Sequence, residues 1–294
     1  FSSFGSSITY CNAKQTFNCP APVAIVADID VIAAAPKEMT AAGYADLAAK
    51  IPAGAEWIIA DFVNAEPIIP EAWHLLQDYL DDFLARPSAV AEGDPDAIAD
   101  LFEGLTLSGF AMQAARSSRP ASCCDHLFSH ILDITHHRYK GKLQSHGFQV
   151  AIGTLTMCAV FDELFKLDLT KIDVEKCVAA WPSLEAEQAR AKEIFKDFPA
   201  PDLGYTQITQ KYEGKEKVRE ELTKLVAQWS ELKARLQNQV YSFDKMQNYF
   251  KLAGAPYEPS QIGVTREQLK DMFPKVQLMR FRFNLLDLAK RGNF

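Results

Sequence analysis

SSRPASCCDHLFSH, residues 117–130, is the stretch around which the rest of this sequence is organised. Its Ser-Arg-Pro start is typical of a chain entering a helix. If residues 122–139 form that helix, His126 and His130 lie one turn apart on the same face. A histidine pair on a helix is most often a packing feature or part of a solvated face, so the pair alone does not predict a site.

A third histidine changes that interpretation. His146-Gly147 opens a second long apolar helix, predicted over residues 147–166. An imidazole at the start of one helix, facing an imidazole inside a neighbouring helix, forms a two-ligand half-site for zinc or a related divalent cation. The residues of this stretch supply no third ligand.

Composition and charge exclude several classes of protein. The 294 residues are 48% hydrophobic and 23% charged, which is typical of a globular chain. Residues 1–150 carry 9 Lys and Arg against 18 Asp and Glu, so the front half is acidic and a nucleic-acid partner is not expected. The sequence has no apolar run of 18 residues, and we expect no membrane span. Six cysteines without a CxxC spacing indicate a reduced, cytoplasmic protein.

The pattern of apolar residues predicts a mainly α-helical fold with a small amount of sheet at its front. A β-hairpin is expected within the first 19 residues, and the apolar run over residues 22–27 predicts a buried strand. From Pro36 onward the apolar spacing is helical. The expected helices cover residues 38–51, 54–64, 70–86, 94–105, 106–117, 122–139, 147–166, 218–253, from 265 onward, and 276–290.

The predicted sheet is too small for the strand that it should hold. A buried strand needs neighbouring strands, and one hairpin hardly supplies them. The sequence contains neither a G-x-G-x-x-G nor a Walker-type loop, so it shows no phosphate cradle. We therefore expect the remaining strands either to come from residues absent from this sequence or to be severely reduced.

Four blocks of sequence together resemble one known family. They are AAGYADLAAK (41–50), SRPAS (118–122) with His126 and His130, His146-Gly147, and RFRFNLLDL (280–288). In this order they resemble the glycerol-1-phosphate dehydrogenases, which belong to the superfamily of iron-containing alcohol dehydrogenases and dehydroquinate synthases. The resemblance runs from about Ser2 to the C-terminus.

The resemblance implies a fold and an activity. Residues 1–35 would be the C-terminal remnant of an α/β nucleotide-binding domain, and residues 36–294 an α-helical metal-binding catalytic domain of the dehydroquinate synthase-like fold. The family reaction is reversible hydride transfer between NADH or NADPH and dihydroxyacetone phosphate, which gives sn-glycerol 1-phosphate. The implied cofactors are NAD or NADP and one divalent cation, zinc first, with nickel and iron as alternatives. A small phosphorylated polyol or ketone is the implied substrate, and a homo-oligomer is the implied assembly.

The resemblance also implies roles for individual residues. Asp46, His126 and His146 would be the metal ligands, and Asp46 and His130 would act as catalytic residues in contact with the substrate. Ser3 would lie against the nicotinamide cofactor. One carboxylate and two imidazoles leave a coordination position open, where a substrate oxygen can bind a Lewis-acidic cation.

Several departures from the family pattern keep alternatives open. The family's nucleotide-binding half would lie upstream of Phe1. Alanine replaces the family's glycine at Ala45, which would be strained if that position needed a positive φ. Cys123 would share the helix face of His126, either as a buried small residue or as a change to the metal site.

A catalytically inactive paralogue that serves as a structural or assembly subunit is therefore the alternative function, and a different reaction of the same superfamily is a third. Arg280 and Arg282 either pair with Asp287, the interpretation we favour, or serve a phosphate group.

Overall fold

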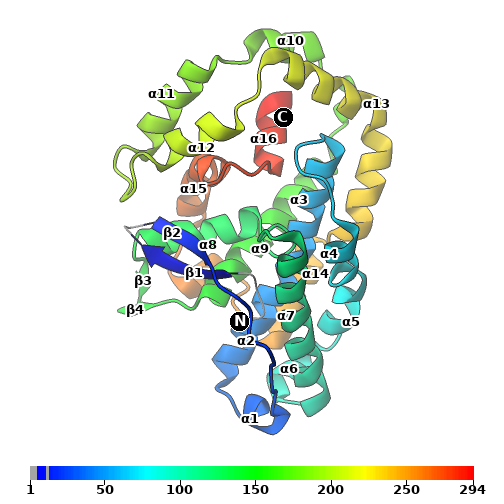
Figure 1. The fold of residues 1–294 in the computed structure, drawn as a ribbon, viewed down its shortest axis with the longest axis vertical. Coiled ribbons are helices and arrows are strands. Elements are labelled where there is room, and N and C mark those ends of the chain that lie inside the picture. Colours follow the sequence, from blue (N-terminus) through cyan, green and yellow to red (C-terminus); the bar gives the residue numbers. More distant parts are fainter. Residues whose placement is uncertain (1–4, 11–12) are drawn as a thin grey trace.

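The computed structural model describes residues 5–10 and 13–294, and this part of the chain is almost entirely helical (Figure 1). The predicted mainly α class and the predicted hairpin are both confirmed. The hairpin pairs β1 (Gly5–Tyr10) with β2 (Ala13–Asn18) in antiparallel register, with Gly5 opposite Asn18. A second, two-residue ladder pairs β3 (Arg138–Tyr139) with β4 (Lys142–Leu143).

The described helices follow one another through the rest of the chain. They are α1 (Ile29–Ala33), α2 (Lys37–Ala48), α3 (Lys50–Phe62), α4 (Pro70–His74), α5 (Leu80–Leu84), α6 (Pro87–Glu92), α7 (Pro95–Ala115), α8 (Cys124–Ile134), α9 (His146–Leu164), α10 (Val174–Ala180), α11 (Leu184–Phe195), α12 (Leu203–Lys211), α13 (Lys215–Gln239), α14 (Phe243–Ala253), α15 (Arg266–Leu278) and α16 (Leu285–Gly292). Three short 3₁₀ turns, η1 (Gln77–Tyr79), η2 (Leu169–Lys171) and η3 (Pro259–Ile262), complete the set.

Local capping decides where the structure departs from the predicted boundaries. The helices expected at 94–105 and 106–117 are the single helix α7, which Asp94 caps by accepting a hydrogen bond from the Ala97 amide. The helix expected over 218–253 is instead α13 and α14. The Ser242 side chain caps the second of these at the Lys245 amide, so the chain restarts there rather than continuing.

The prediction of a strand over residues 22–27 is wrong. This segment forms no strand in the structure, and the side chains of Val23 and Val26 are 107% and 93% exposed. The apolar run predicted burial because such runs fill the centres of sheets. No strand of the described chain lies beside it, however, and a strand without a hydrogen-bonded neighbour is not stable.

Three helices, α2, α8 and α9, meet at the centre of the molecule (Figure 1). Two glycines of α9 bring their backbones into contact. A Cβ on Gly147 would lie 2.1 Å from the Ala42 carbonyl oxygen of α2, and one on Gly153 would lie 2.0 Å from the Asp125 carbonyl oxygen of α8. The helices can approach this closely only because both positions lack a side chain.

None of the described helices combines the length and the apolar composition that crossing a lipid bilayer requires.

Candidate metal centre

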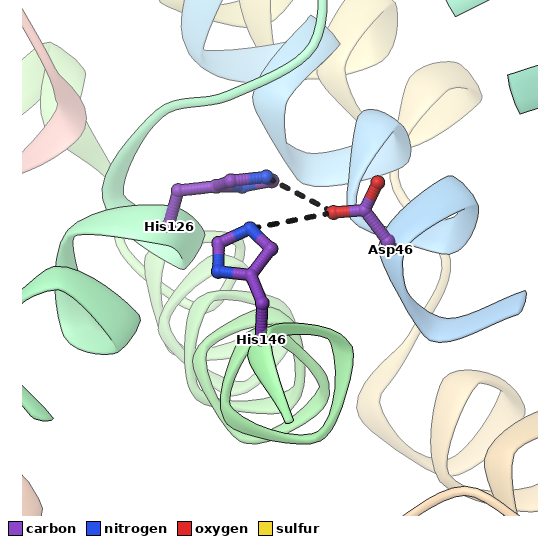
Figure 2. A group of neighbouring side chains, drawn as sticks. All are labelled: Asp46, His126 and His146. Atoms are coloured by element: carbon purple, nitrogen blue, oxygen red, sulfur yellow. Dashed lines mark ion pairs between the residues drawn. The ribbon is translucent and has the colours of Figure 1, made fainter. Parts of the chain in front are cut away.

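The contact of these three helices brings Asp46, His126 and His146 together (Figure 2). Asp46 Oδ1 of α2 lies 3.2 Å from His126 Nε2 of α8 and 3.8 Å from His146 Nε2 of α9. Zinc bonds of about 2.1 Å place neighbouring ligands of a tetrahedron about 3.4 Å apart. Both distances from Asp46 Oδ1 are close to this value, and all three atoms lie within 4.8 Å of one another, so they can share one divalent cation.

Hydrogen bonds behind His126 turn its Nε2 toward Asp46. The fully buried Asp125 carboxylate bonds His126 Nδ1, and its other oxygen accepts from the Cys123 amide at 3.1 Å. A carboxylate can only accept, so Nδ1 carries the proton and the Nε2 lone pair faces Asp46. A carboxylate behind a histidine in this way is typical of metal ligands.

His146 is oriented in the same sense by two other polar side chains. Ser129 Oγ donates to Gln149 Oε1 at 2.7 Å and lies 3.0 Å from His146 Nδ1. The Gln149 amide nitrogen donates to the Gln144 carbonyl, which fixes the direction of the amide group. Because the one hydroxyl proton of Ser129 goes to Gln149, Ser129 accepts from Nδ1, and the Nε2 of His146 is also left with a lone pair.

The Asp46 carboxylate completes a site that attracts positive charge. Lys50 Nζ lies 3.1 Å from Oδ2, whereas Oδ1 is buried without a well-formed hydrogen bond. Burial alone would raise the pKa of Asp46, but Lys50, His126 and His146 outweigh it and hold the pKa well below its usual range. Burial also disfavours the imidazolium form of His126, yet the Asp125 and Asp46 carboxylates raise its pKa. A carboxylate oxygen and the Nε2 atoms of two imidazoles thus converge on one point, where a divalent cation could replace the proton between His126 and Asp46.

A cavity of about 900 Å³ opens beside this point. Asp46, His126 and His146 form part of its wall, and His130 lines it one turn further along α8. The side chain of His146 is 42% exposed, so the three-residue cluster is not closed off from the cavity. A substrate oxygen can therefore reach the open side of the cluster.

Glu56 and Arg119 build a rigid frame around the start of α8. Glu56 accepts the Cys124 amide at 2.9 Å and the Leu285 amide at 3.0 Å, one on each carboxylate oxygen. Arg119 donates to the carbonyl oxygens of Glu56 and Phe283. Glu56, Arg119 and the amides that they join are buried, so these bonds fix the start of α8 against α3 and the start of α16.

Cys123 belongs to this frame and not to the metal centre, so the prediction that it shares the helix face of His126 is wrong. The helix begins at Cys124, and Cys123 precedes it with φ −143° and ψ −133°. Its sulfur accepts a hydrogen bond from Arg119 at 3.4 Å and lies close to Glu56 and Cys124. Ala45 lies inside α2 and is not among the described residues with positive φ, so its methyl group causes no backbone strain.

The expected ion pairs of Arg280 and Arg282 with Asp287 are also not found. Asp287 pairs with Lys211 at 2.8 Å and caps the start of α16 through the Asn284 amide. Arg282 donates instead to the Ser122 carbonyl and the Ser117 hydroxyl. Ser3, implied to contact the cofactor, lies outside the described residues.

Comparison with known proteins points to one kind of enzyme, although no protein-family model matches the chain. Three curated relatives carry the same name, glycerol-1-phosphate dehydrogenase [NAD(P)+]. The one from Bacillus licheniformis is 32% identical over 60% of this chain and 44% of its own length. Those from Pyrococcus horikoshii and Hyperthermus butylicus are 36% and 40% identical, over 53% and 46% of this chain and 44% and 38% of their own lengths.

This chain resembles the glycerol-1-phosphate dehydrogenases. The resemblance predicted from the sequence blocks is thus confirmed by these relatives. The chain spans about half the length of the curated relatives that it matches.

The residues that orient the candidate ligands of this glycerol-1-phosphate dehydrogenase-like chain were not predicted from the sequence. Asp125, Ser129 and Gln149 carry no motif of their own. The available signal was the position of Asp125 directly before a candidate ligand and of Ser129 one turn after Asp125. Adjacent residues of a helix usually point apart, so that signal is weak.

Replacing Asp125 by asparagine should weaken metal binding by roughly 10- to 100-fold. The asparagine amide would donate to His126 Nδ1, move the ring proton to Nε2 and so block the ligand atom. Competition with a fluorescent zinc chelator measures the affinity. Asp133→Asn, on the same helix α8, is the matched control. Equal losses in the two variants would contradict the proposed orientation of His126.

Proposed function

We propose that this chain carries the catalytic helical domain of an NAD(P)-dependent oxidoreductase that interconverts dihydroxyacetone phosphate and sn-glycerol 1-phosphate. The observation that carries the proposal is the convergence of Asp46, His126 and His146 on one point in the wall of a large cavity. The shared name of the curated relatives supports the reaction. In this proposal residues 36–294 form the helical domain and residues 1–35 belong to the nucleotide-binding domain, where Ser3 would contact NAD or NADP.

The three ligands would hold one divalent cation, zinc as the first candidate. Such a cation supplies Lewis acidity, which polarises a ketone for hydride transfer and stabilises the negative charge on oxygen. Asp125 and Ser129 hold the two imidazoles with their Nε2 atoms toward the cation position, and the cavity leaves room for the substrate. Hydride transfer itself is the chemistry of the nicotinamide.

His130 has a separate role in the proposal. It is buried on α8, one turn beyond His126, and it lines the same cavity. From there it can donate a hydrogen bond to the substrate or exchange a proton with its hydroxyl group. It acts beside the metal ligands and is not one of them.

An inactive paralogue fits less well. Its main support in the sequence was the pair of departures at Ala45 and Cys123, and neither residue belongs to the ligand cluster. A cytoplasmic homo-oligomer remains our expectation for the assembled protein, on the same resemblance.

The test is an assay of the protein expressed from its complete gene. We expect about one zinc, nickel or iron per chain and oxidation of NADH or NADPH when dihydroxyacetone phosphate is added. A folded protein that binds no metal and cannot be reloaded would support the inactive paralogue. A metal-containing protein that is inactive with this substrate would support another reaction of the superfamily.

A further inference from the structure

Arg280 is a cation in the cavity wall that has no counter-charge among the described residues. It lies just after α15 and lines the same cavity as His126 and His130. Within the part of the chain that the structure describes, its guanidinium makes no hydrogen bond and no ion pair. Nearby Arg119 and Arg282 differ, because each donates to two or more protein oxygens.

The charges of the cavity wall leave Arg280 unbalanced. Asp46 is the one carboxylate among the described lining residues, and it already faces Lys50 and the two imidazoles. Burial lowers the pKa of Arg280, so the surrounding protein disfavours its charge and offers nothing in return. A partly buried charge is stabilised by a partner of opposite charge, and an anionic ligand would supply that partner.

The surroundings of Arg280 also suit an anion. A second, much smaller pocket of about 10 Å³ shares five lining residues with the cavity, and Arg282 lines it as well. The shared residues are Ser118, Ser122, His126, His130 and Arg280. The Arg282 guanidinium donates to Ser117, Ser118 and the Ser122 carbonyl, so its position is fixed, and its Nε lies 3.8 Å from the Glu66 carboxylate. Glu66 therefore offsets part of the charge of Arg282, whereas Arg280 has no such neighbour among the described residues. No carboxylate lines this smaller pocket among the described residues.

We propose that Arg280 binds the phosphate group of the substrate and so makes the site specific for phosphorylated ketones and polyols. A guanidinium binds phosphate through two parallel N–H donors, which fixes position as well as charge. With the phosphate on Arg280, the other end of the substrate faces the Asp46–His126–His146 cluster across the cavity. This inference rests on the proposed function, since it assigns the phosphate end of the same substrate.

The test compares ligands with and without phosphate on the zinc-loaded protein expressed from its complete gene. Isothermal titration calorimetry measures binding of sn-glycerol 1-phosphate, inorganic phosphate and glycerol. We expect Arg280→Met to weaken binding of both phosphate ligands by roughly 10- to 100-fold. Glycerol binding and zinc content should not change. Arg280→Lys should lose less phosphate affinity than Arg280→Met, because lysine keeps the positive charge but not the two parallel N–H donors.

Arg266→Met is the matched control, since Arg266 is exposed at the start of α15 and lines none of these cavities. Its affinities should equal those of the wild type. If circular dichroism shows that Arg280→Met misfolds, the same binding measurements are made on Arg280→Gln and Arg280→Lys.

The possible outcomes separate this inference from the proposed function. If the Arg280 variants bind glycerol 1-phosphate as tightly as the wild type, or if the wild type binds no phosphate ligand, the inference is overturned and the metal centre is unaffected. If phosphate binding depends on Arg280 but no NAD(P)-linked reduction of dihydroxyacetone phosphate occurs, the inference stands and the proposed reaction fails. If the Arg280 variants lose binding of inorganic phosphate but still bind sn-glycerol 1-phosphate, Arg280 holds only the free ion, and the inference is also overturned.

Discussion

Asp46→Asn is expected to remove the bound metal and to destabilise the fold. The substitution takes away the one anionic ligand of the cluster, so metal affinity should fall by more than the roughly 100-fold that loss of a residue behind a ligand can cause. It also leaves Lys50, whose side chain is 2% exposed, without its carboxylate partner. Removing one member of a buried ion pair costs about 3–5 kcal/mol. Because the Asp46 side chain is 25% exposed, we expect about 2 kcal/mol here.

A second variant separates the two effects. Asp46→Asn combined with Lys50→Met removes the unpaired ammonium, so urea unfolding should return most of the lost stability while zinc binding stays absent. His146→Gln gives an independent check, because the His146 side chain is 42% exposed and lies 3.8 Å from Asp46 Oδ1, further away than the 3.1 Å between Lys50 Nζ and Asp46. It should lose metal affinity with little change in stability. One zinc per chain in Asp46→Asn would contradict the assignment of Asp46 as a ligand.

Gly147→Ala should be strongly destabilising, because it adds a methyl group at the contact of α2 and α9. The new Cβ would lie 2.1 Å from the Ala42 carbonyl oxygen and 2.8 Å from the Ala42 Cα. These are backbone atoms of a helix, so α2 and α9 must move apart. Overpacking of this kind costs about 1–3 kcal/mol and sometimes more, and we expect at least the upper figure. The movement would also separate Asp46 from His146, so zinc affinity should fall together with the urea midpoint.

Gly43→Ala is the matched control on α2. Its Cβ would meet only the Leu105 side chain, at 3.4 Å, and alanine favours a helix over glycine by about 1 kcal/mol. We therefore expect unchanged or slightly higher stability. If Gly147→Ala were as stable as Gly43→Ala, the close crossing of α2 and α9 would be wrong.

The helical class was predictable from the sequence because apolar spacing directly reports helix faces. Boundaries that depend on a single cap, such as the restart of the chain at Ser242, were not. The apolar run around Val23 and Val26 failed for a different reason. Such a run is buried only if other strands pair with it, and the local sequence carries no information about those strands. Local composition therefore cannot predict whether the run is buried.

The candidate site was predictable only in part. The spacing of His126, His130 and His146 indicated a half-site, but Asp46 is 80 residues away from His126 and entered through the family resemblance. Which residues meet there depends on the backbone contacts at Gly147 and Gly153, which are tertiary properties. The misplacement of Cys123 shows how sensitive such predictions are to a helix start, since the predicted helix began at 122 and the actual one begins at Cys124.

X-ray absorption at the zinc edge of the metal-loaded protein would identify the ligands of the metal. We expect one zinc per chain, bound by nitrogen and oxygen at about 2.0–2.2 Å, with scattering from two imidazoles and none from sulfur. A sulfur shell at about 2.3 Å, or zinc that remains at full occupancy in His146→Gln, would contradict it. The first result would move the metal to Cys123 and Cys124, and the second would remove His146 from the ligand set.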